Sequence, residues 1–318
     1  MSPIFVLITL EQKDKSSKTK IWLVFSGIIL AYLPATHHIQ TRWQQAKKKI
    51  VNKLKTGEFY GTHYQTLAFE NIVITDTEYT HSKVDWHHHE NPYFTYLLQG
   101  KLFESNKKES YYLEPGSLLF HNWQEAHFNI KPPEFTRGFH IEMNENWLSN
   151  FDIQTTDFEG SINLKNPLIK NIMNKLFIES KVNDQYSNLS IETFLLEIFS
   201  TIKETKERSS KKPNWIKKLQ ELLFEEQIDY SLKNLSSILG IHPVHLSREF
   251  NKHFGTSLGN YIRIIKVNQA FNLIALNQLS MTEVCYKCGF YDQSHFIKNF
   301  KQVYRTTPSK FLKKISIC

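Results

Sequence analysis

The sequence predicts an α+β protein of two domains, in which an N-terminal β-barrel with a helical pair precedes an all-helical C-terminal domain. Residues 58–142 consist of short segments rich in β-branched and aromatic side chains, separated by turn signals such as Pro115-Gly116. Many short strands at close spacing are typical of a barrel or a sandwich. From Trp215 onwards, apolar residues recur at helical spacing. The 318 residues are enough for two separate hydrophobic cores.

Net charge divides the chain into three blocks. Residues 1–55 hold 10 Lys and Arg against 2 Asp and Glu, a net charge of +8. Residues 56–205 hold 11 against 21, a net charge of −10, and residues 206–318 hold 18 against 8, a net charge of +10. An acidic surface repels the phosphates of nucleic acid, whereas a basic surface attracts them. If the protein binds DNA, we therefore expect the C-terminal block to bind it.

An apolar run occupies residues 21–34 and is interrupted only by Ser26 and Gly27. A membrane-spanning helix needs about 20 such residues, whereas a run of roughly 10–14 is typical of a signal-peptide core or a buried helix. We expect residues 1–55 to be a basic extension that is a start-site artefact or is disordered. A membrane segment at 21–34 and a signal sequence are the two alternatives.

The cysteines are Cys285, Cys288 and Cys318, a set that does not form the pattern of a disulfide framework and that favours a reducing cytoplasm. Cys285 and Cys288 have the spacing of half a zinc site or of a redox pair. No second pair of ligands follows in the nearby sequence. We therefore expect both side chains to pack as small apolar groups in a helical core.

Two amphipathic helices are predicted after the strands, over residues 166–181 and 190–204. Residues 206–213 are rich in charge, end in Pro213 and contain no hydrophobic residue, so we expect a linker there. The predicted organisation is a strand-rich domain at 56–145, a helical pair within 146–205, the linker, and a helical domain at 214–318.

The C-terminal block contains one helix-turn-helix pattern twice. In residues 230–255, the first helix is expected to end at Gly240 and the second to begin at Pro243. The pattern recurs in residues 279–311, where Gly289 marks the turn. A helix of roughly 18–20 residues between the two patterns would span about 27–30 Å. That length is close to the roughly 34 Å that separates successive major grooves on one face of DNA.

Both repeats resemble the tandem helix-turn-helix domain of AraC/XylS-type transcription regulators. The matching residues are Leu232, Leu235, Leu246, Ser247, Arg248, Phe250, Gly255, Tyr261, Ala270, Gly289, Phe290, Asp292, Ser294, His295, Phe296, Phe300, Lys301, Thr307, Pro308 and Ser309. The sequence departs from the family at Ser236, Lys266 and Arg305, where Ala, Arg and Gly are usual. Such differences bear on local packing or on a phosphate contact and leave the resemblance intact.

The resemblance implies which side chains face DNA. They are Val244, Ser247 and Arg248 in the first unit, and Gln293, Ser294, His295 and Lys298 in the second. Arginine suits guanine, glutamine suits adenine, and valine can make only apolar contact, for example with a thymine methyl group. On an isolated helix, Arg248 and Lys298 would be interpreted as solvated charges, whereas the tandem pattern favours contact with DNA.

Three consecutive histidines lie in VDWHHHENPYF, residues 84–94. Alternate side chains of a strand share a face, so His87 and His89 point one way and His88 the other. With the later stretch PGSLLFHNWQEAHF, these residues resemble the cupin barrel found in many such regulators. The resemblance implies a double-stranded β-helix in which His127 approaches His87 and His89.

We expect these histidines to line an effector pocket and not a catalytic site. Metal-using cupins supply a carboxylate a few residues after the second histidine, but Tyr93 and Phe94 occupy that region here, and His121 is displaced from the family pattern. The expected pocket is free of metal and consists of His87, His89, Tyr93, Trp123 and His127, with aromatic side chains that suit an apolar or mixed organic ligand. If a metal is bound, its expected ligands are His87, His89 and His127.

These inferences together predict a sequence-specific DNA-binding transcription regulator, controlled by a small-molecule effector in the cupin-like barrel. We expect no enzymatic activity and no cofactor. The expected partners are double-stranded promoter DNA, an effector, a second copy of the chain through the helical pair, and RNA polymerase if the protein is an activator. The expected location is the cytoplasm. A cupin metalloenzyme with a DNA-binding tail and a membrane-anchored regulator are the alternatives.

Overall fold

The computed structural model describes residues 20–25, 28–34, 51–122, 124–154, 158, 160–209, 213–223 and 229–315. The chain divides into two compact units, residues 1–51 and residues 52–318. In the first unit, strands β1 (Lys20–Phe25) and β2 (Ile28–Pro34) pair as an antiparallel hairpin over the apolar run. Within the described ranges, no helix is long and apolar enough to cross a membrane. The remainder of the predicted basic extension up to residue 50 lies outside the described residues.

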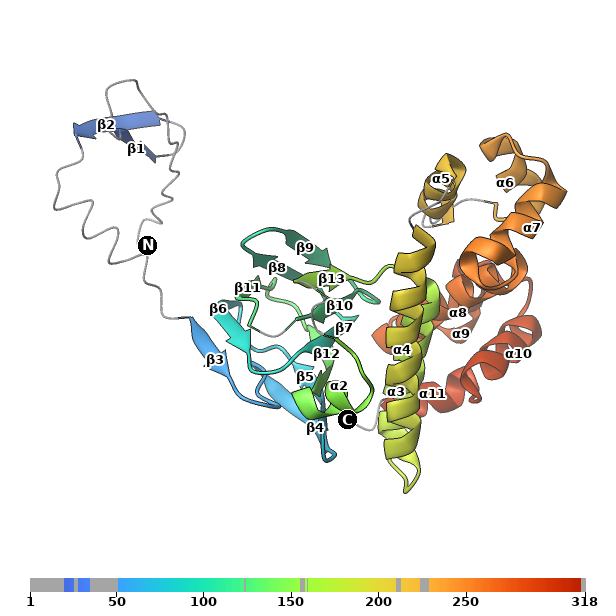
Figure 1. Ribbon diagram of the computed structural model, residues 1–318, viewed down its shortest axis with the longest axis horizontal. Coiled ribbons are helices and arrows are strands. Elements are labelled where there is room, and N and C mark those ends of the chain that lie inside the picture. The colour runs from blue at the N-terminus through green and yellow to red at the C-terminus, as the bar shows by residue number, and fades with distance from the viewer. Residues whose placement is uncertain are drawn as a thin grey trace. The chain divides into compact units, whose positions relative to one another are not determined.

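Two sheets form the strand-rich part of the second unit (Figure 1). The six-stranded sheet has the order β13-β10-β7-β12-β5-β4, and the five-stranded sheet has the order β3-β6-β11-β8-β9. Neighbouring strands are antiparallel, apart from β3 and β6, which are parallel. The strands are β3 (Asn52–Leu54), β4 (Thr62–Ala68), β5 (Ile72–Glu78), β6 (Lys83–His89), β7 (Tyr93–Gln99), β8 (Leu102–Asn106), β9 (Ser110–Leu113), β10 (Leu118–His121), β11 (His127–Ile130), β12 (Arg137–Met143) and β13 (Ser161–Asn163).

The two sheets pack against each other, and strand alternation decides which side chains meet between them. Phe94 and Tyr96 of β7 belong to a large core shared with the helices, whereas Leu97 packs with Leu102 and Leu113 of the five-stranded sheet. Strand β7 is buried almost throughout, because helices cover one face of its sheet and the second sheet covers the other. This double-sheet architecture, followed by helices, confirms the predicted α+β fold class.

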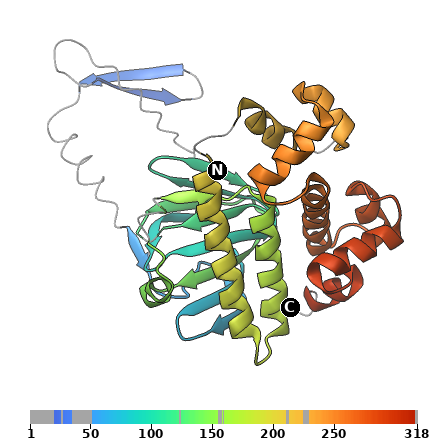
Figure 2. The ribbon, with the colours of Figure 1, turned by 45° about the vertical axis from the view of Figure 1, so that its right-hand side comes forward.

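A pair of long helices lies side by side across the six-stranded sheet (Figure 2). After the short helix α2 (Glu145–Asn150), these are α3 (Pro167–Val182) and α4 (Ser187–Ser209). Asn166 caps α3, and Asn183 ends it in the left-handed conformation. The two predicted amphipathic helices are therefore present, although α4 continues into the predicted linker at 206–213.

The C-terminal helices follow the caps that the sequence predicts. Gly240 ends α6 with a φ of 65°, Pro243 begins α7, and Ser280 and Glu283 form a capping box at α9. Asp292 caps α10 through the backbone N–H of the third helical residue. The helices are α5 (Asn214–Leu223), α6 (Leu232–Leu239), α7 (Pro243–Phe254), α8 (Leu258–Leu276), α9 (Met281–Lys287), α10 (Gln293–Tyr304) and α11 (Pro308–Ile315).

Two hydrophobic clusters divide these helices between them. Leu219, Leu235 and Phe250 belong to a core built by α5, α6, α7 and the first part of α8. The second part of α8, with α9, α10 and α11, shares one large core with α3 and the six-stranded sheet. In that core, the ring centroids of Phe177 on α3 and Phe271 on α8 lie 6.0 Å apart. The second helix-turn-helix unit therefore packs directly on the helical pair.

Buried polar side chains cross the same contact. Asn268 of α8 accepts a hydrogen bond from Asn171 Nδ2 of α3 at 3.0 Å and donates one to the carbonyl of Pro167 at 2.8 Å. The hydroxyl of Tyr304 on α10 also donates to Asn268 Oδ1, at 2.8 Å. Buried polar groups that satisfy one another in this way specify a single relative arrangement of the elements that carry them.

Cys285 and Cys288 are both buried in the large core, which confirms that they pack as apolar side chains. Burial raises the pKa of the Cys288 thiol to about 12. A thiol held protonated in this way is a poor nucleophile and a poor metal ligand. Cys318 lies outside the described residues.

Candidate functional site

Helix α7 presents the first set of side chains that we predicted to face DNA. Leu246 and Phe250 are fully buried on its inner face and fix the rotation of the helix about its axis. On the outer face, Val244 is 69% exposed, the Arg248 side chain is 73% exposed, and Ser247 is also exposed. All three predicted contact residues are thus available to an external partner.

Helix α10 repeats this arrangement in the second unit. Asp292 caps the helix by accepting a hydrogen bond from the His295 backbone N–H at 2.7 Å, and Phe296 and Phe300 anchor its inner face. The face that remains exposed carries Gln293, Ser294, His295 and Lys298. The 19-residue helix α8 connects the two units.

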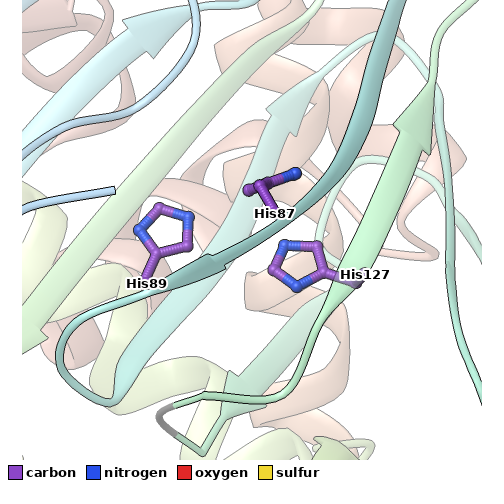
Figure 3. A group of neighbouring side chains, drawn as sticks. All are labelled: His87, His89 and His127. Atoms are coloured by element: carbon purple, nitrogen blue, oxygen red, sulfur yellow. The ribbon is translucent and has the colours of Figure 1, made fainter. Parts of the chain in front are cut away.

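A second candidate site lies between the two sheets, and we call it the histidine cavity. Strands β6 and β11 pair so that His127 lies opposite His87, and His89 follows on the same face of β6 (Figure 3). These three side chains are 2–3% exposed, whereas His88 points to the other face and is half-buried. One potential ligand atom from each of the three imidazoles lies within 4.8 Å of the other two.

Backbone carbonyls fix the tautomers of two of these rings. His87 Nδ1 donates to the carbonyl of Asp85 at 2.8 Å, and His127 Nδ1 donates to the carbonyl of Glu125 at 3.0 Å. Because a carbonyl can only accept, Nδ1 carries the proton and Nε2 keeps a free electron pair in each neutral ring. The hydroxyl of Tyr93 donates to Nε2 of His127 at 3.1 Å.

The structure adds two residues that the sequence did not place here, Glu104 of β8 and His121 of β10. Both are almost fully buried, and Glu104 Oε1 lies 3.5 Å from His121 Nδ1. Together with His127, they form a second group whose ligand atoms lie within 4.8 Å of one another. The cupin resemblance places a carboxylate a few residues after His89, where Tyr93 and Phe94 lie. The sequence pattern that could have indicated Glu104 is the alternation of β8, in which Leu102, Glu104 and Asn106 share the buried face.

Burial determines the charge state of this cavity. Desolvation lowers the pKa of His87 to about 3 and the pKa of His127 to about 4, so both imidazoles are neutral at pH 7. Desolvation also raises the pKa of Glu104 to about 8, even though Asn129 donates a hydrogen bond to its Oε2 at 2.8 Å. The cavity therefore gathers neutral electron-pair donors around one carboxyl group.

The histidine cavity is small. Its volume is about 30 Å³, and Phe59, Tyr60 and Tyr93 contribute aromatic rings to its wall. Pockets for organic ligands usually measure roughly 300–1,000 Å³, whereas a single water needs only about 10–15 Å³. The space suits a water molecule or an ion. Trp123, the remaining residue of the predicted pocket, lies outside the described residues.

The C-terminal part of the chain has a recognisable family match. The helix-turn-helix domain family matches residues 235–314, which include α7, α8, α9 and α10. Residues 235–314 are an AraC-type helix-turn-helix domain. This match confirms the resemblance inferred from the sequence. Helices α7 and α10, which carry the two exposed faces described above, both lie within the matched residues.

Curated transcriptional regulators align with this chain over different lengths. The transcriptional activator RhaS of Mannheimia succiniciproducens is 25% identical over 62% of this chain and 77% of its own length. The transcriptional regulator GlxA of Rhizobium meliloti is 31% identical over 25% of each chain. An uncharacterized transcriptional regulator of Haemophilus influenzae is 26% identical over 30% of this chain and 32% of its own. The chain thus spans a third or less of the length of the last two relatives.

Solved structures of ToxT align with most of the chain. Apo ToxT from Vibrio cholerae covers 76% of this chain and 97% of its own, with 16% sequence identity and a TM-score of 0.35.

Proposed function

We propose that the protein is a sequence-specific DNA-binding transcription regulator whose AraC-type domain binds promoter DNA. The observation that carries this proposal is the match of residues 235–314 to the helix-turn-helix domain family. The exposed faces of α7 and α10 supply Arg248 and Lys298, which can contact base edges and phosphates. The net charge of +10 over residues 206–318 suits a polyanionic partner.

We infer that the double sheet senses an effector and controls the DNA-binding domain. An effector that binds better to one arrangement of the two parts shifts the equilibrium towards that arrangement. The polar contact through Asn171 and Asn268 joins the helical pair to α8. A displacement of α3 would therefore also displace α8 of the AraC-type domain. The protein acts in this account by binding alone, without catalysis, and its proposed location is the cytoplasm, where promoter DNA is found.

A homodimer is part of the same proposal, with the helical pair as its contact. The end of α3, the following turn and the start of α4 expose the apolar side chains of Val182, Tyr186 and Leu189, which are 40%, 64% and 67% exposed. Apolar side chains gathered at one exposed tip suit a contact with a second copy. If the regulator is an activator, RNA polymerase is a further partner.

A genome-wide map of bound DNA tests the proposed function. We expect the wild-type chain to occupy discrete promoter sites, and we expect these sites to be lost when Arg248 and Lys298 are both replaced by alanine. A map without discrete sites, or a map that the double substitution leaves unchanged, would contradict the proposal.

A further inference from the structure

The histidine cavity contains buried polar atoms that the fold leaves unsatisfied. Glu104 Oε1, His121 Nε2 and His89 Nδ1 have no hydrogen-bond partner among the described residues. An unpaired buried polar atom costs about 1–3 kcal/mol, and more if it is charged. Three such atoms on residues that surround His127 are unusual, because native proteins satisfy the great majority of their buried polar groups. They point to a ligand that accepts electron pairs.

The charge around the cavity supports a cation. Glu104 is 3% exposed, and the ammonium group of Lys131, which also borders the cavity, bonds the carbonyls of Pro132 and Glu134. A cation bound here would take the place of the carboxyl proton of Glu104 and accept electron pairs from the imidazoles at the same time.

Neighbouring groups already hold the side chains in place. Asn129 donates to Glu104 Oε2, the Glu125 carbonyl accepts from His127 Nδ1, and Ser161 Oγ lies 3.2 Å from His121 Nδ1. Metal ligands in proteins are usually oriented by such outer contacts. The carboxyl group itself comes from β8 and not from the position where the cupin resemblance places one, because Tyr93 occupies that position.

We propose that the histidine cavity binds one divalent transition-metal ion through Glu104, His121 and His127, and that this ion is the effector of the regulator. Two imidazoles and one carboxylate, with positions left open, suit iron(II) and related ions such as zinc. His127 is shared with the group of His87 and His89, but only the group with Glu104 offsets the charge of the ion. This proposal rests on the proposed function, because it names the effector class of the same cavity.

The positions of the ligands suggest how the ion would act. Glu104 and His127 belong to β8 and β11 of the five-stranded sheet, whereas His121 belongs to β10 of the six-stranded sheet. An ion bound by all three joins the two sheets. Strand β10 pairs with β13 at His121 and Ser161, and β13 leads directly into α3. Through Asn171, α3 contacts Asn268 of the AraC-type domain.

Metal titration of the purified full chain tests the site. After treatment with a chelator, the protein is titrated with zinc and, without oxygen, with iron(II), and bound metal is counted by elemental analysis. We expect one ion per chain. We expect magnesium to bind far more weakly, because it prefers a full set of oxygen ligands. Absence of stoichiometric zinc and iron binding would overturn the proposal.

Four substitutions locate the ligands. Glu104→Gln and His121→Gln should each weaken metal binding by roughly 100-fold or more, since loss of an outer contact alone costs roughly 10- to 100-fold. His88→Gln, on the other face of β6, should bind like the wild type. Circular dichroism and thermal unfolding check that each variant folds. If only one of the two ligand variants folds, its metal affinity alone tests the assignment. If both bind zinc like the wild type, or if only His87→Gln abolishes binding, the assignment to Glu104 and His121 is overturned.

A DNA-binding measurement on the same samples separates this proposal from the proposed function. Fluorescence anisotropy with a bound promoter fragment should show that metal changes the DNA affinity of the wild type and not that of Glu104→Gln. If the chain binds DNA but no metal, the proposed metal site is overturned and the proposed function stands. Metal binding without any DNA binding would overturn the proposed function as a DNA-binding regulator. Metal binding with an unchanged DNA affinity would overturn the role of the ion as effector.

Discussion

Nδ1 of His121 lies 3.5 Å from Oε1 of Glu104, although the two residues belong to strands of different sheets. His127 belongs both to the group with this pair and to the group with His87 and His89, so imidazoles and a carboxyl group meet where the sheets face each other. A cavity of this composition supplies a set of electron-pair donors, and α3, which follows β13 of the six-stranded sheet, contacts α8 of the helix-turn-helix domain through Asn171 and Asn268.

Replacing Arg248 with alanine should weaken binding to a cognate DNA site. If its exposed guanidinium reads a base, the loss should be about 1–3 kcal/mol, or roughly 5- to 150-fold in Kd. Fluorescence anisotropy at fixed salt measures it. Lys107→Ala removes the same charge from the turn between β8 and β9 and should change Kd little. Equal effects of the two substitutions would show that Arg248 contributes only through net charge.

Asp76→Asn should destabilise the double sheet and its contact with α3. Asp76 is 1% exposed and accepts two hydrogen bonds from Arg137 at 2.6 Å, and Lys181 of α3 also contacts it. Burial alone would raise the pKa of Asp76, but these two cations hold that pKa below its ordinary value. The substitution removes from both cations the buried carboxylate charge that Asp76 supplies.

We expect the free energy of unfolding of Asp76→Asn to fall by about 3–5 kcal/mol, as when one partner of a buried ion pair is removed. Urea unfolding measures the change. Asp152→Asn is the matched control, since Asp152 is exposed and its left-handed conformation also suits asparagine. A change below 1 kcal/mol for Asp76→Asn would contradict the predicted role of the cluster.

His140 should make the protein sensitive to acid. Burial lowers the pKa of its imidazole to about 3 in the folded state, while an unfolded histidine titrates near 6.5. The unfolded state therefore binds the proton first, and stability that is present above pH 6.5 is lost as the pH falls towards 3.

For His140 alone, the predicted loss of unfolding free energy is about 1.4 kcal/mol per pH unit below 6.5. In His140→Gln, whose amide can still bond Thr75 and Tyr79, the slope between pH 6.5 and 5.5 should be shallower by about that amount. Urea unfolding at a series of pH values gives both slopes. Between pH 7.5 and 8.5 the imidazole is neutral in both states, so the substitution should not alter the slope there. Identical slopes below pH 6.5 would refute the prediction.

Asn268→Ala should weaken the coupling between α3 and the AraC-type domain. It removes partners from Asn171, Tyr304 and the Pro167 carbonyl, and we expect an unfolding free energy lower by about 2–3 kcal/mol. The effect of metal on DNA affinity should also shrink, while metal binding itself persists. Asn188→Ala, at an exposed position of α4, is the control. Full retention of the metal effect would show that the signal takes another route.

Local patterns made much of this molecule predictable. Strand alternation placed His87 and His89 on one face and His88 on the other, and Gly240, Pro243 and Asp292 marked helix ends that the structure confirms. These features depend on one strand or one helix terminus at a time. The repeated helix-turn-helix pattern was equally local, so its family could be inferred before any fold was known.

The contribution of Glu104 and His121 could not be predicted in the same way. Glu104 approaches His127 because β8 pairs with β11 in the same sheet, and His121 approaches it because the six-stranded sheet packs against that sheet. The predicted linker at 206–213 was partly wrong for a related reason. Its charged residues are compatible with a helix, and α4 continues to Ser209. The charged composition of residues 206–213 indicates that they are exposed to solvent, but it does not determine at which residue α4 ends.

The most direct test of the central claim is selection of DNA from a random library by the purified full chain. Two recognition helices joined by α8 predict a recovered consensus with two conserved elements centred about 10–10.5 base pairs apart. Substitutions on α7 should relax one element, and substitutions on α10 the other. Enrichment of no sequence, or of a consensus that neither set of substitutions alters, would contradict the assignment of this protein as a DNA-reading regulator.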